Sequence, residues 1–212
     1  MIVEERMTVF INSLDAGLPK ALAELEKEAI AGHVPIIRKD MQAYLKYEML
    51  RSRPKNILEV GTATGFSALL MSEYAPKAHI TTIENYDKRI PIARENIALF
   101  GKSGSITLLE GDALEILPKL TDTYDFIFMD AAKGQYIHYL PDIMRVLDKG
   151  GILVSDNVLQ DGEIIESKYA VVRRDRTIHT RMREYLYELK HNEGLSTVIL
   201  PVGDGITVSV KI

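Results

Sequence analysis

The chain has 212 residues, of which 46% are hydrophobic and 26% charged, and a formal net charge of −4. This length and apolar content suit one compact domain with a large core. The acidic balance excludes a global basic field for nucleic acid but permits a local basic patch. Cysteine is absent, which excludes disulfides, zinc–thiolate sites and a cysteine nucleophile.

The start of the chain does not have the layout of a signal peptide, because Glu4, Glu5 and Arg6 interrupt its apolar residues. No apolar run approaches the roughly 20 residues that a membrane-spanning helix needs. We therefore expect a soluble, cytoplasmic protein with no membrane partner.

The N-terminal quarter is predicted to be helical, with helices over residues 4–14, 19–32 and 39–52. There is no low-complexity linker and no internal repeat to mark a domain boundary. We therefore expect a single domain over residues 1–212. Within it, a helical cap or interface over residues 1–53 would accompany a core over residues 54–212.

From residue 56 onward, strands and helices alternate. Predicted strands cover residues 56–60, 79–84, 105–110, 124–130, 151–156, 196–200 and 205–211. Predicted helices lie near residues 65–75, 86–100, 113–119, 136–147 and 177–191. Alternation with short loops favours a mostly parallel sheet covered on both faces. The link Pro201-Val202-Gly203-Asp204-Gly205 is too short for a parallel crossover, so the last strand should be antiparallel.

The stretch Asn56-Ile-Leu-Glu-Val-Gly-Thr-Ala-Thr-Gly-Phe-Ser67 predicts a strand, a turn on Gly61 and Gly65, and a helix start. This is typical of a nucleotide-binding α/β unit. The glycine spacing is G-x-x-x-G and no Gly-Lys-Ser/Thr follows, which disfavours a phosphate cradle. Glu59 would repel a pyrophosphate but suits a cationic ligand such as S-adenosylmethionine, with its ammonium and sulfonium. The alternative is an ordinary strand-to-helix turn without a ligand.

The next two strand ends also carry acids. Glu84 follows the glycine turn by about 20 residues, where an acid accepts ribose hydroxyls in nucleotide-binding folds. Its alternative role is to cap the following helix. Gly111-Asp112-Ala113 ends the third strand, where it would border an adenine edge or form an ordinary turn.

Three oxygen-bearing side chains follow the fourth and fifth strands, namely Asp130, Asp156 and Asn157. The carboxyl ends of parallel strands converge on one crevice, so the three side chains could bind one ion. Oxygen ligands without Cys or His select a hard cation, Mg2+ first and Mn2+ or Ca2+ next. The alternative is that they are unrelated helix caps and turns.

Three motifs together resemble the metal-dependent O-methyltransferases, a group that includes catechol and caffeoyl-coenzyme A O-methyltransferases. They are Val60-Gly-Thr-Ala-Thr-Gly-Phe-Ser67, Met129-Asp-Ala-Ala-Lys-Gly-Gln-Tyr136 and Ser155-Asp-Asn157. The resemblance implies an α/β, Rossmann-like class I methyltransferase fold, with a seven-stranded, mostly parallel sheet and an antiparallel last strand. It is closest to the bacterial branch that methylates 5-hydroxyuridine at the tRNA wobble position, giving 5-methoxyuridine.

The resemblance also implies roles for individual residues. Asp130, Asp156 and Asn157 would be the metal ligands, and Lys133 would be the general base, acting with Asp130. Lys133 could instead be a solvated loop lysine or an electrostatic partner. Ala131 and Ala132 stand where the catechol enzymes have aromatic gatekeepers, which would admit a larger substrate. S-adenosylmethionine would contact Ile37, Glu59, Gly61, Thr62, Gly65, Ser67, Glu84, Asp112, Ala113 and Asp130.

A basic segment runs from Lys168 to Arg183 and contains one acid, Asp175. Such a cluster could contact RNA phosphates, or it could be a solvated helix face or form dimer salt bridges. Tyr136 and Tyr139 could stack on a base or belong to the core. The candidates for RNA contact are Lys168, Arg173, Arg174, Arg176 and Arg181.

The favoured function is therefore Mg2+-dependent methylation of 5-hydroxyuridine in a tRNA anticodon loop by a homodimer that associates through its N-terminal helices. The first alternative is the same chemistry on a small catechol or a caffeoyl-coenzyme A type substrate. In either case two neighbouring oxygens would chelate the metal and align the in-line displacement. A silent cofactor-binding module is a second alternative. The glycine spacing disfavours a nicotinamide dehydrogenase.

Overall fold

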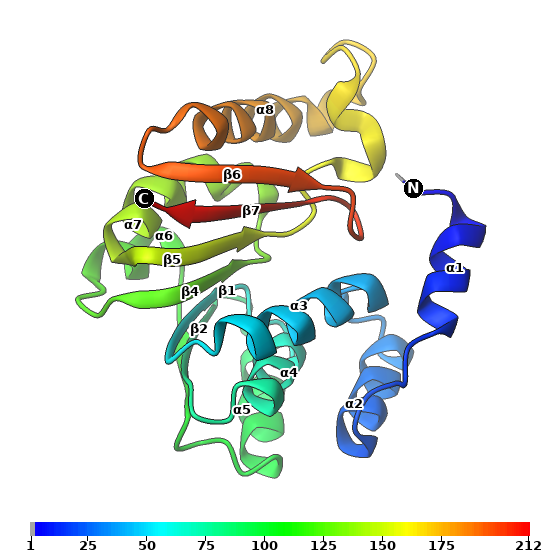
Figure 1. The fold of residues 1–212 in the computed structure, drawn as a ribbon, viewed down its shortest axis with the longest axis vertical. Helices are drawn as coiled ribbons and strands as arrows, with labels where there is room; N and C mark the ends of the chain where they lie inside the picture. The colour runs from blue at the N-terminus through cyan, green and yellow to red at the C-terminus, as the bar shows by residue number, and fades with distance from the viewer. Residues whose placement is uncertain (1–2) are drawn as a thin grey trace.

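The computed structural model describes residues 3–212, so residues 1 and 2 of the predicted cap lie outside the described residues. Strands alternate with helices in the predicted order (Figure 1). The strands are β1 (Asn56–Val60), β2 (His79–Glu84), β3 (Ile106–Glu110), β4 (Tyr124–Met129), β5 (Leu147–Ser155), β6 (Leu195–Leu200) and β7 (Ile206–Lys211). The α-helices are α1 (Glu5–Ser13), α2 (Lys20–Ala31), α3 (Lys39–Ser52), α4 (Phe66–Tyr74), α5 (Ile90–Leu99), α6 (Ala113–Ile116), α7 (Tyr136–Val146) and α8 (Arg176–His191). Short 3-10 helices are η1 (Leu117–Lys119), η2 (Lys133–Gln135), η3 (Gln160–Ile165) and η4 (Arg173–Asp175).

The described strands form one seven-stranded sheet in the order β3-β2-β1-β4-β5-β7-β6. β1 pairs in parallel with β2 and β4, whereas β7 pairs antiparallel with both β5 and β6. The predicted fold class is therefore confirmed, including the antiparallel last strand. The strand order reverses between β1 and β4, and ligands of open α/β sheets bind at the carboxyl edge beside such a reversal.

The sheet is buried on both faces, as its apolar runs predict. Neighbouring residues on a strand point to opposite faces, so Ile57 and Leu58 of β1 enter different clusters. One cluster joins the sheet to α2, α3 and α4, and the other joins it to α7 and α8. The architecture is a three-layer α/β/α sandwich, which leaves the strand ends free to build a site.

The helices before the sheet differ in how they pack. α2 and α3 contribute Leu22, Leu25, Met41, Leu45 and Met49 to the cluster that contains α4. In contrast, none of the nine residues of α1 is buried, and Figure 1 shows α1 standing at the side of the molecule. The two later helices therefore belong to the main core, whereas α1 leaves its apolar face unpaired. In residues 3–212, no helix has both the length and the apolar character to cross a membrane.

Two elements begin four residues away from their predicted starts. β5 begins at Leu147 rather than at residue 151, because Gly150 takes a φ of +78° and the strand continues through an irregular pairing with β4. α5 begins at Ile90 rather than at residue 86, because the backbone amides of Asn85 and Tyr86 bond the Glu84 carboxylate in a turn first.

Candidate active site

A cavity of about 560 Å³ lies where the carboxyl ends of the parallel strands meet. The strap Pro35–Arg38, which connects α2 to α3, forms another part of its wall. Many of the residues predicted from the sequence line this one cavity: Ile37, Gly61, Thr62, Ser67, Glu84, Ala113, Asp130, Lys133, Asp156 and Asn157. Glu59, Gly65 and Asp112 are not among its lining residues, and neither are the five predicted RNA contacts.

The turn after β1 contributes Gly61, a residue without a side chain, to the cavity wall. Gly61 has a φ of +104°, and a Cβ there would lie 2.1 Å from the carbonyl oxygen of Asp130. The amides of Gly61 and Thr62 both donate to the carbonyl oxygen of Ile83, at 3.0 and 3.1 Å. Gly65, with a φ of +86°, caps the start of α4. In the G-x-x-x-G motif, Gly61 therefore allows the close approach of the Asp130 backbone, and Gly65 takes the left-handed conformation that begins α4.

Glu59 lies beneath this turn and is fully buried. One carboxylate oxygen accepts a hydrogen bond from the Thr82 hydroxyl, whereas the other has no partner among the described residues. Burial raises the pKa of Glu59 to about 7, and the Ser67 and Thr82 side chains offset part of this effect. An unpaired buried carboxylate oxygen beside the cavity favours a cationic ligand over an anionic one.

Glu84 lies on the cavity wall, and its carboxylate is fixed by backbone. It accepts from the amides of Ala63 at 2.7 Å, Asn85 at 3.0 Å and Tyr86 at 2.8 Å. Two of these bonds belong to a capping-type turn, so the helix-cap alternative and a ligand role are compatible at Glu84. At Asp112 the carboxylate instead caps α6 by accepting from the Leu114 amide at 2.9 Å, and the side chain stays exposed.

Asp130 and Asp156 end adjacent strands. Each backbone amide extends the sheet by one bond of 2.9 Å, from Asp130 to Val60 and from Asp156 to Met129. Burial raises the pKa of Asp130 to about 6 and that of Asp156 to about 7, and Lys133 partly offsets both effects. Asp156 is buried and Asp130 is partly buried, and a cation bound in the cavity would stabilise the charged form of both carboxyl groups.

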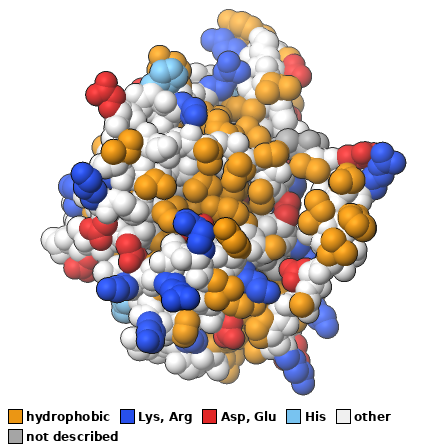
Figure 2. Space-filling model, viewed as in Figure 1, with side chains coloured by type: hydrophobic (Ala, Val, Ile, Leu, Met, Phe, Trp, Pro, Cys, Tyr) orange, Lys and Arg blue, Asp and Glu red, His pale blue; other side chains and the backbone are white. Residues whose placement is uncertain are grey.

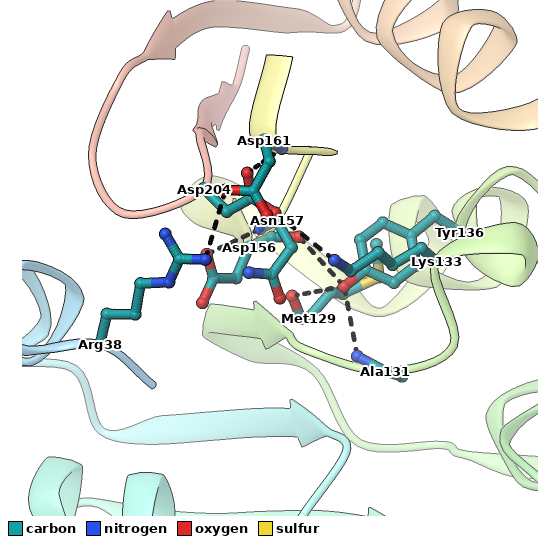
Figure 3. A network of polar contacts seen from close by, with 9 residues as sticks. All are labelled: Arg38, Met129, Ala131, Lys133, Tyr136, Asp156, Asn157, Asp161 and Asp204. Atoms are coloured by element: carbon teal, nitrogen blue, oxygen red, sulfur yellow. Dashed lines mark hydrogen bonds and ion pairs between the residues drawn. The ribbon is translucent and has the colours of Figure 1, made fainter. Parts of the chain in front are cut away.

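Asn157 completes the oxygen cluster from the residue next to Asp156 (Figure 3). Its φ of +56° is left-handed, and its amide donates to the Asp156 carboxylate at 2.7 Å. Within residues 3–212, no three His, Cys, Asp or Glu side chains form a group suited to a metal ion. A metal here would therefore take two carboxylates and one amide oxygen from the protein, with water or substrate oxygens completing its shell.

Lys133 lies on η2 beside the two alanines that line the cavity, Ala131 and Ala132. Its Nζ atom is 3.6 Å from a carboxylate oxygen of Asp204. Tyr136 is fully buried, and its hydroxyl accepts from the Ala131 amide at 3.2 Å. The idea that Tyr136 stacks on a base is therefore wrong, because its ring belongs to the core. Tyr139 is also buried but contributes to the cavity lining.

Comparison with known proteins decides the family. Residues 12–212 match the protein family described as O-methyltransferase. The chain is 31% identical over 212 residues to caffeoyl-CoA O-methyltransferase 5 of Nicotiana tabacum, covering 92% of this chain and 85% of that one. It is 35% identical over 117 residues to a catechol O-methyltransferase of Niastella koreensis, which is 53% of either chain. The chain belongs to the O-methyltransferase family. Within it, the relatives place the chain with the S-adenosylmethionine-dependent class I enzymes of the caffeoyl-CoA and catechol type.

A solved structure agrees with this assignment. The SAH-bound Podospora anserina methyltransferase PaMTH1 superposes on this O-methyltransferase with a TM-score of 0.88 at 27% identity. The match covers 98% of this chain and 94% of that one. The seven-stranded sheet with its antiparallel last strand is thus the fold of an O-methyltransferase.

Three arginines in the basic segment of this O-methyltransferase donate to backbone carbonyls. Arg176 donates to the Val171 carbonyl at 3.2 Å, Arg181 to the Gly134 carbonyl at 3.1 Å and Arg183 to the Ile164 carbonyl at 2.8 Å. Two predicted RNA contacts, Arg176 and Arg181, thus have structural bonds that the charge pattern alone could not predict. The exposed basic residues that remain are Lys168, Arg173 and Arg174.

Sequence reasoning missed several residues that line the cavity of this O-methyltransferase. Arg38 and Asp161 face each other across it, with 3.4 Å between guanidinium and carboxylate. Asp204 is 3% exposed and follows β6, which runs in the same direction as β5 and ends at the same edge. Applying the strand-end rule to β6 as well would have found Asp204. No local pattern marks the others, namely Pro35, Ile36, Tyr86 and Arg89.

Proposed function

We propose that this O-methyltransferase transfers the methyl group of S-adenosylmethionine to one of two neighbouring oxygens on an aromatic ring, with Mg2+ bound at Asp130, Asp156 and Asn157. The observation that carries the proposal is the single cavity shared by the glycine turn, Glu84 and the oxygen cluster. One cavity lets the methyl donor and the acceptor oxygen meet in line, as a displacement at carbon requires.

The shape and charge of the residues around the glycine turn support the proposed binding of S-adenosylmethionine. Gly61 offers backbone with no room for a side chain, so the methionine part can lie close to it. The unpaired oxygen of Glu59 supplies negative charge below that position. Glu84, held by three amides, has acceptor capacity left for ribose hydroxyls. We propose the remaining contacts at Ile37, Thr62, Ser67 and Ala113, because each lines the cavity.

The metal half rests on the chemistry of the donors. The three proposed ligands are all oxygen, which suits Mg2+, with Mn2+ or Ca2+ as substitutes. A bound Mg2+ would lower the pKa of a coordinated substrate hydroxyl. The raised pKa values of Asp130 and Asp156 support this, because they reflect buried carboxyl groups without enough compensating charge. Lys133 would accept the hydroxyl proton at its Nζ atom.

For the acceptor, we propose a small catechol-like molecule or its coenzyme A ester. The named relatives support this choice, since they are described as caffeoyl-CoA and catechol O-methyltransferases. The structure weakens the RNA alternative, because Arg176 and Arg181 bond backbone carbonyls.

The second candidate is 5-hydroxyuridine in a tRNA anticodon loop. It is favoured by the small side chains of Ala131 and Ala132 at the cavity, and by the exposed Lys168, Arg173 and Arg174. The 5-hydroxyl and the O4 carbonyl would form the chelating pair. Phosphate contacts through these three residues would make the activity fall steeply with salt.

A single comparison tests the substrate class. Purified protein would receive labelled S-adenosylmethionine and, in parallel, a catechol, caffeoyl-coenzyme A or hypomodified tRNA, each with Mg2+ or with a chelator. We expect metal-dependent labelling of the small acceptors at a rate that salt changes little. Labelling of the tRNA alone, lost in Arg173→Ala/Arg174→Ala, would move the assignment to RNA. Labelling that the chelator leaves unchanged would contradict the metal site.

We also propose that the protein is a homodimer that associates through its N-terminal helices. Along α1, Met7, Val9, Phe10, Ile11 and Leu14 are all exposed. Figure 2 shows hydrophobic side chains gathered at the position of α1 on the right of the view. An apolar groove of about 650 Å³ between α1 and α3 adds to this surface. Exposed apolar patches of this kind are typical of interfaces.

A further inference from the structure

The link between β6 and β7 places a buried carboxylate inside the cavity. Only 4% of the Asp204 side chain is exposed, and one of its oxygens lies 3.6 Å from Lys133 Nζ. Its other oxygen accepts a hydrogen bond from the Asp161 amide. Figure 3 shows Asp204 between Asp161 and Lys133.

The backbone fixes where Asp204 lies. Its two neighbours are left-handed glycines, with φ of +59° at Gly203 and +79° at Gly205. A Cβ at Gly205 would meet the Leu159 side chain at 2.3 Å. The amides of Val158 and Leu159 donate to the carbonyls of Gly205 and Asp204, at 2.9 and 3.0 Å. The link is therefore locked against the loop that follows Asp156 and Asn157.

Lys133, in contrast, needs an external anchor. It lies on a three-residue 3-10 helix, and about a third of its side chain is exposed. A free lysine side chain samples many rotamers, and restricting it costs about 2 kcal/mol of entropy. A metal would engage Asp130 and Asp156, which leaves the buried Asp204, 3.6 Å from Nζ, to hold the amino group both as the neutral amine that accepts the proton and after it has gained it.

We infer that Asp204 is a positioning residue, which holds Lys133 Nζ toward the acceptor hydroxyl beside the oxygen cluster. This inference rests on the proposed function. In this proposal, the glycine-flanked link orients the Lys133 side chain as well as joining β6 to β7. The ion pair lets the proton that Lys133 accepts stay beside a carboxylate until solvent removes it.

The test compares substitutions of two aspartates, Asp204 on the link and Asp40 on α3, which bonds the same link. Asp204→Asn keeps an oxygen for the Asp161 amide but removes the charge that faces Lys133. Asp40→Asn is the matched control, since Asp40 accepts from the Gly203 amide at 2.7 Å and lines no part of the active-site cavity. We expect Asp204→Asn to lower kcat about 10- to 100-fold, as the loss of an outer-shell partner does. S-adenosylhomocysteine affinity and the activity of Asp40→Asn should change less than about threefold.

A double-mutant cycle separates positioning from folding. In a Lys133→Met background, Asp204→Asn should have little further effect on the residual rate, because the partner is already gone. A further loss as large as in the wild-type background would overturn the inference. So would equal losses from Asp204→Asn and Asp40→Asn, since both would then act only through the hairpin.

A second readout needs no turnover. A lysine-acylating reagent, followed by peptide mass spectrometry, would report the labelling rate of Lys133 in the metal-free protein. We expect Asp204→Asn to speed this labelling several-fold and Asp40→Asn to leave it unchanged. An unchanged rate in Asp204→Asn would overturn the inference. If the wild type methylates no acceptor, the proposed function fails, while this labelling still decides whether Asp204 holds Lys133.

Discussion

At the scale of single residues, Asp156 has the largest upward pKa shift among the carboxyl groups of the site. Burial raises its pKa from an ordinary 3.8 to about 7, and nearby Asp130 adds to the effect. In the metal-free protein the folded state therefore keeps a proton that the unfolded chain releases at lower pH. Stability falls as pH rises from about 4 to about 7, because the folded state binds more protons across that window.

We predict that Asp156→Asn stabilises the metal-free protein above pH 7. Removing a buried charge that lowers the free energy of unfolding by about 2 kcal/mol corresponds to a rise in Tm of roughly 4 to 8 °C in a domain of this size. Calorimetry in chelator at pH 4 and pH 8 would measure it, with most of the gain at pH 8. Asp122→Asn, at an exposed position, is the control. Mg2+ should raise the Tm of the wild type but not of Asp156→Asn.

Gly61 gives a second prediction at this scale. Gly61→Ala should destabilise the protein by about 2 to 4 kcal/mol and abolish cofactor binding, because its Cβ would lie 2.1 Å from the Asp130 carbonyl oxygen. Thermal unfolding and titration calorimetry with S-adenosylhomocysteine would measure both effects. Gly104→Ala is the matched control, since nothing lies within 4 Å of its Cβ position. Normal cofactor binding by Gly61→Ala would show that the turn is not the cofactor wall.

Among elements, the strand ends were the most predictable part of the site. Continuous apolar runs locate the strands, and parallel pairing brings their ends together, so Glu84, Asp130 and Asp156 could be assigned to one edge. In the strap Pro35–Arg38, only Ile37 was predicted, from the family resemblance, because the strap reaches the cavity through the packing of α2 and α3 on α4. Long-range packing of this kind leaves no periodic trace in the sequence.

The basic segment around η4 and the start of α8 also shows what a sequence pattern does not predict. The charge pattern, together with the family resemblance, made the segment from Lys168 to Arg183 a candidate RNA surface. The structure bonds Arg181 to the Gly134 carbonyl on η2, which a count of charges does not reveal. Whether an arginine is free to meet a ligand depends on which carbonyls lie near it in the folded chain.

We predict that Arg181→Ala impairs catalysis rather than substrate affinity. Losing its bond to Gly134 would loosen η2, which carries Lys133, and lower kcat about three- to tenfold, equivalent to ~1 kcal/mol. Steady-state kinetics with a catechol would measure kcat and KM separately. Arg174→Ala, at an exposed position on η4, should leave both unchanged for a small acceptor. A rise in KM alone for Arg181→Ala would contradict this assignment.

At the scale of the whole molecule, α1 exposes apolar side chains that the described part of the chain leaves uncovered. We predict that the wild type is a dimer in solution and that Phe10→Glu, at a position 58% exposed, shifts it to monomer. A charge in a desolvated interface costs more than one in water. Light scattering after size exclusion would measure the mass. Leu99→Glu, 76% exposed on α5, should leave the dimer intact. A monomeric wild type would contradict the proposed assembly.

We propose that one cavity brings S-adenosylmethionine to an acceptor that chelates a metal. The most direct test is methyl transfer from labelled S-adenosylmethionine to a catechol and to the matching monohydroxy phenol, each with Mg2+ or with a chelator. We predict turnover of the catechol with Mg2+ alone, and its loss in Asp130→Ala. Equal turnover of the phenol, or turnover that survives the chelator, would contradict the account.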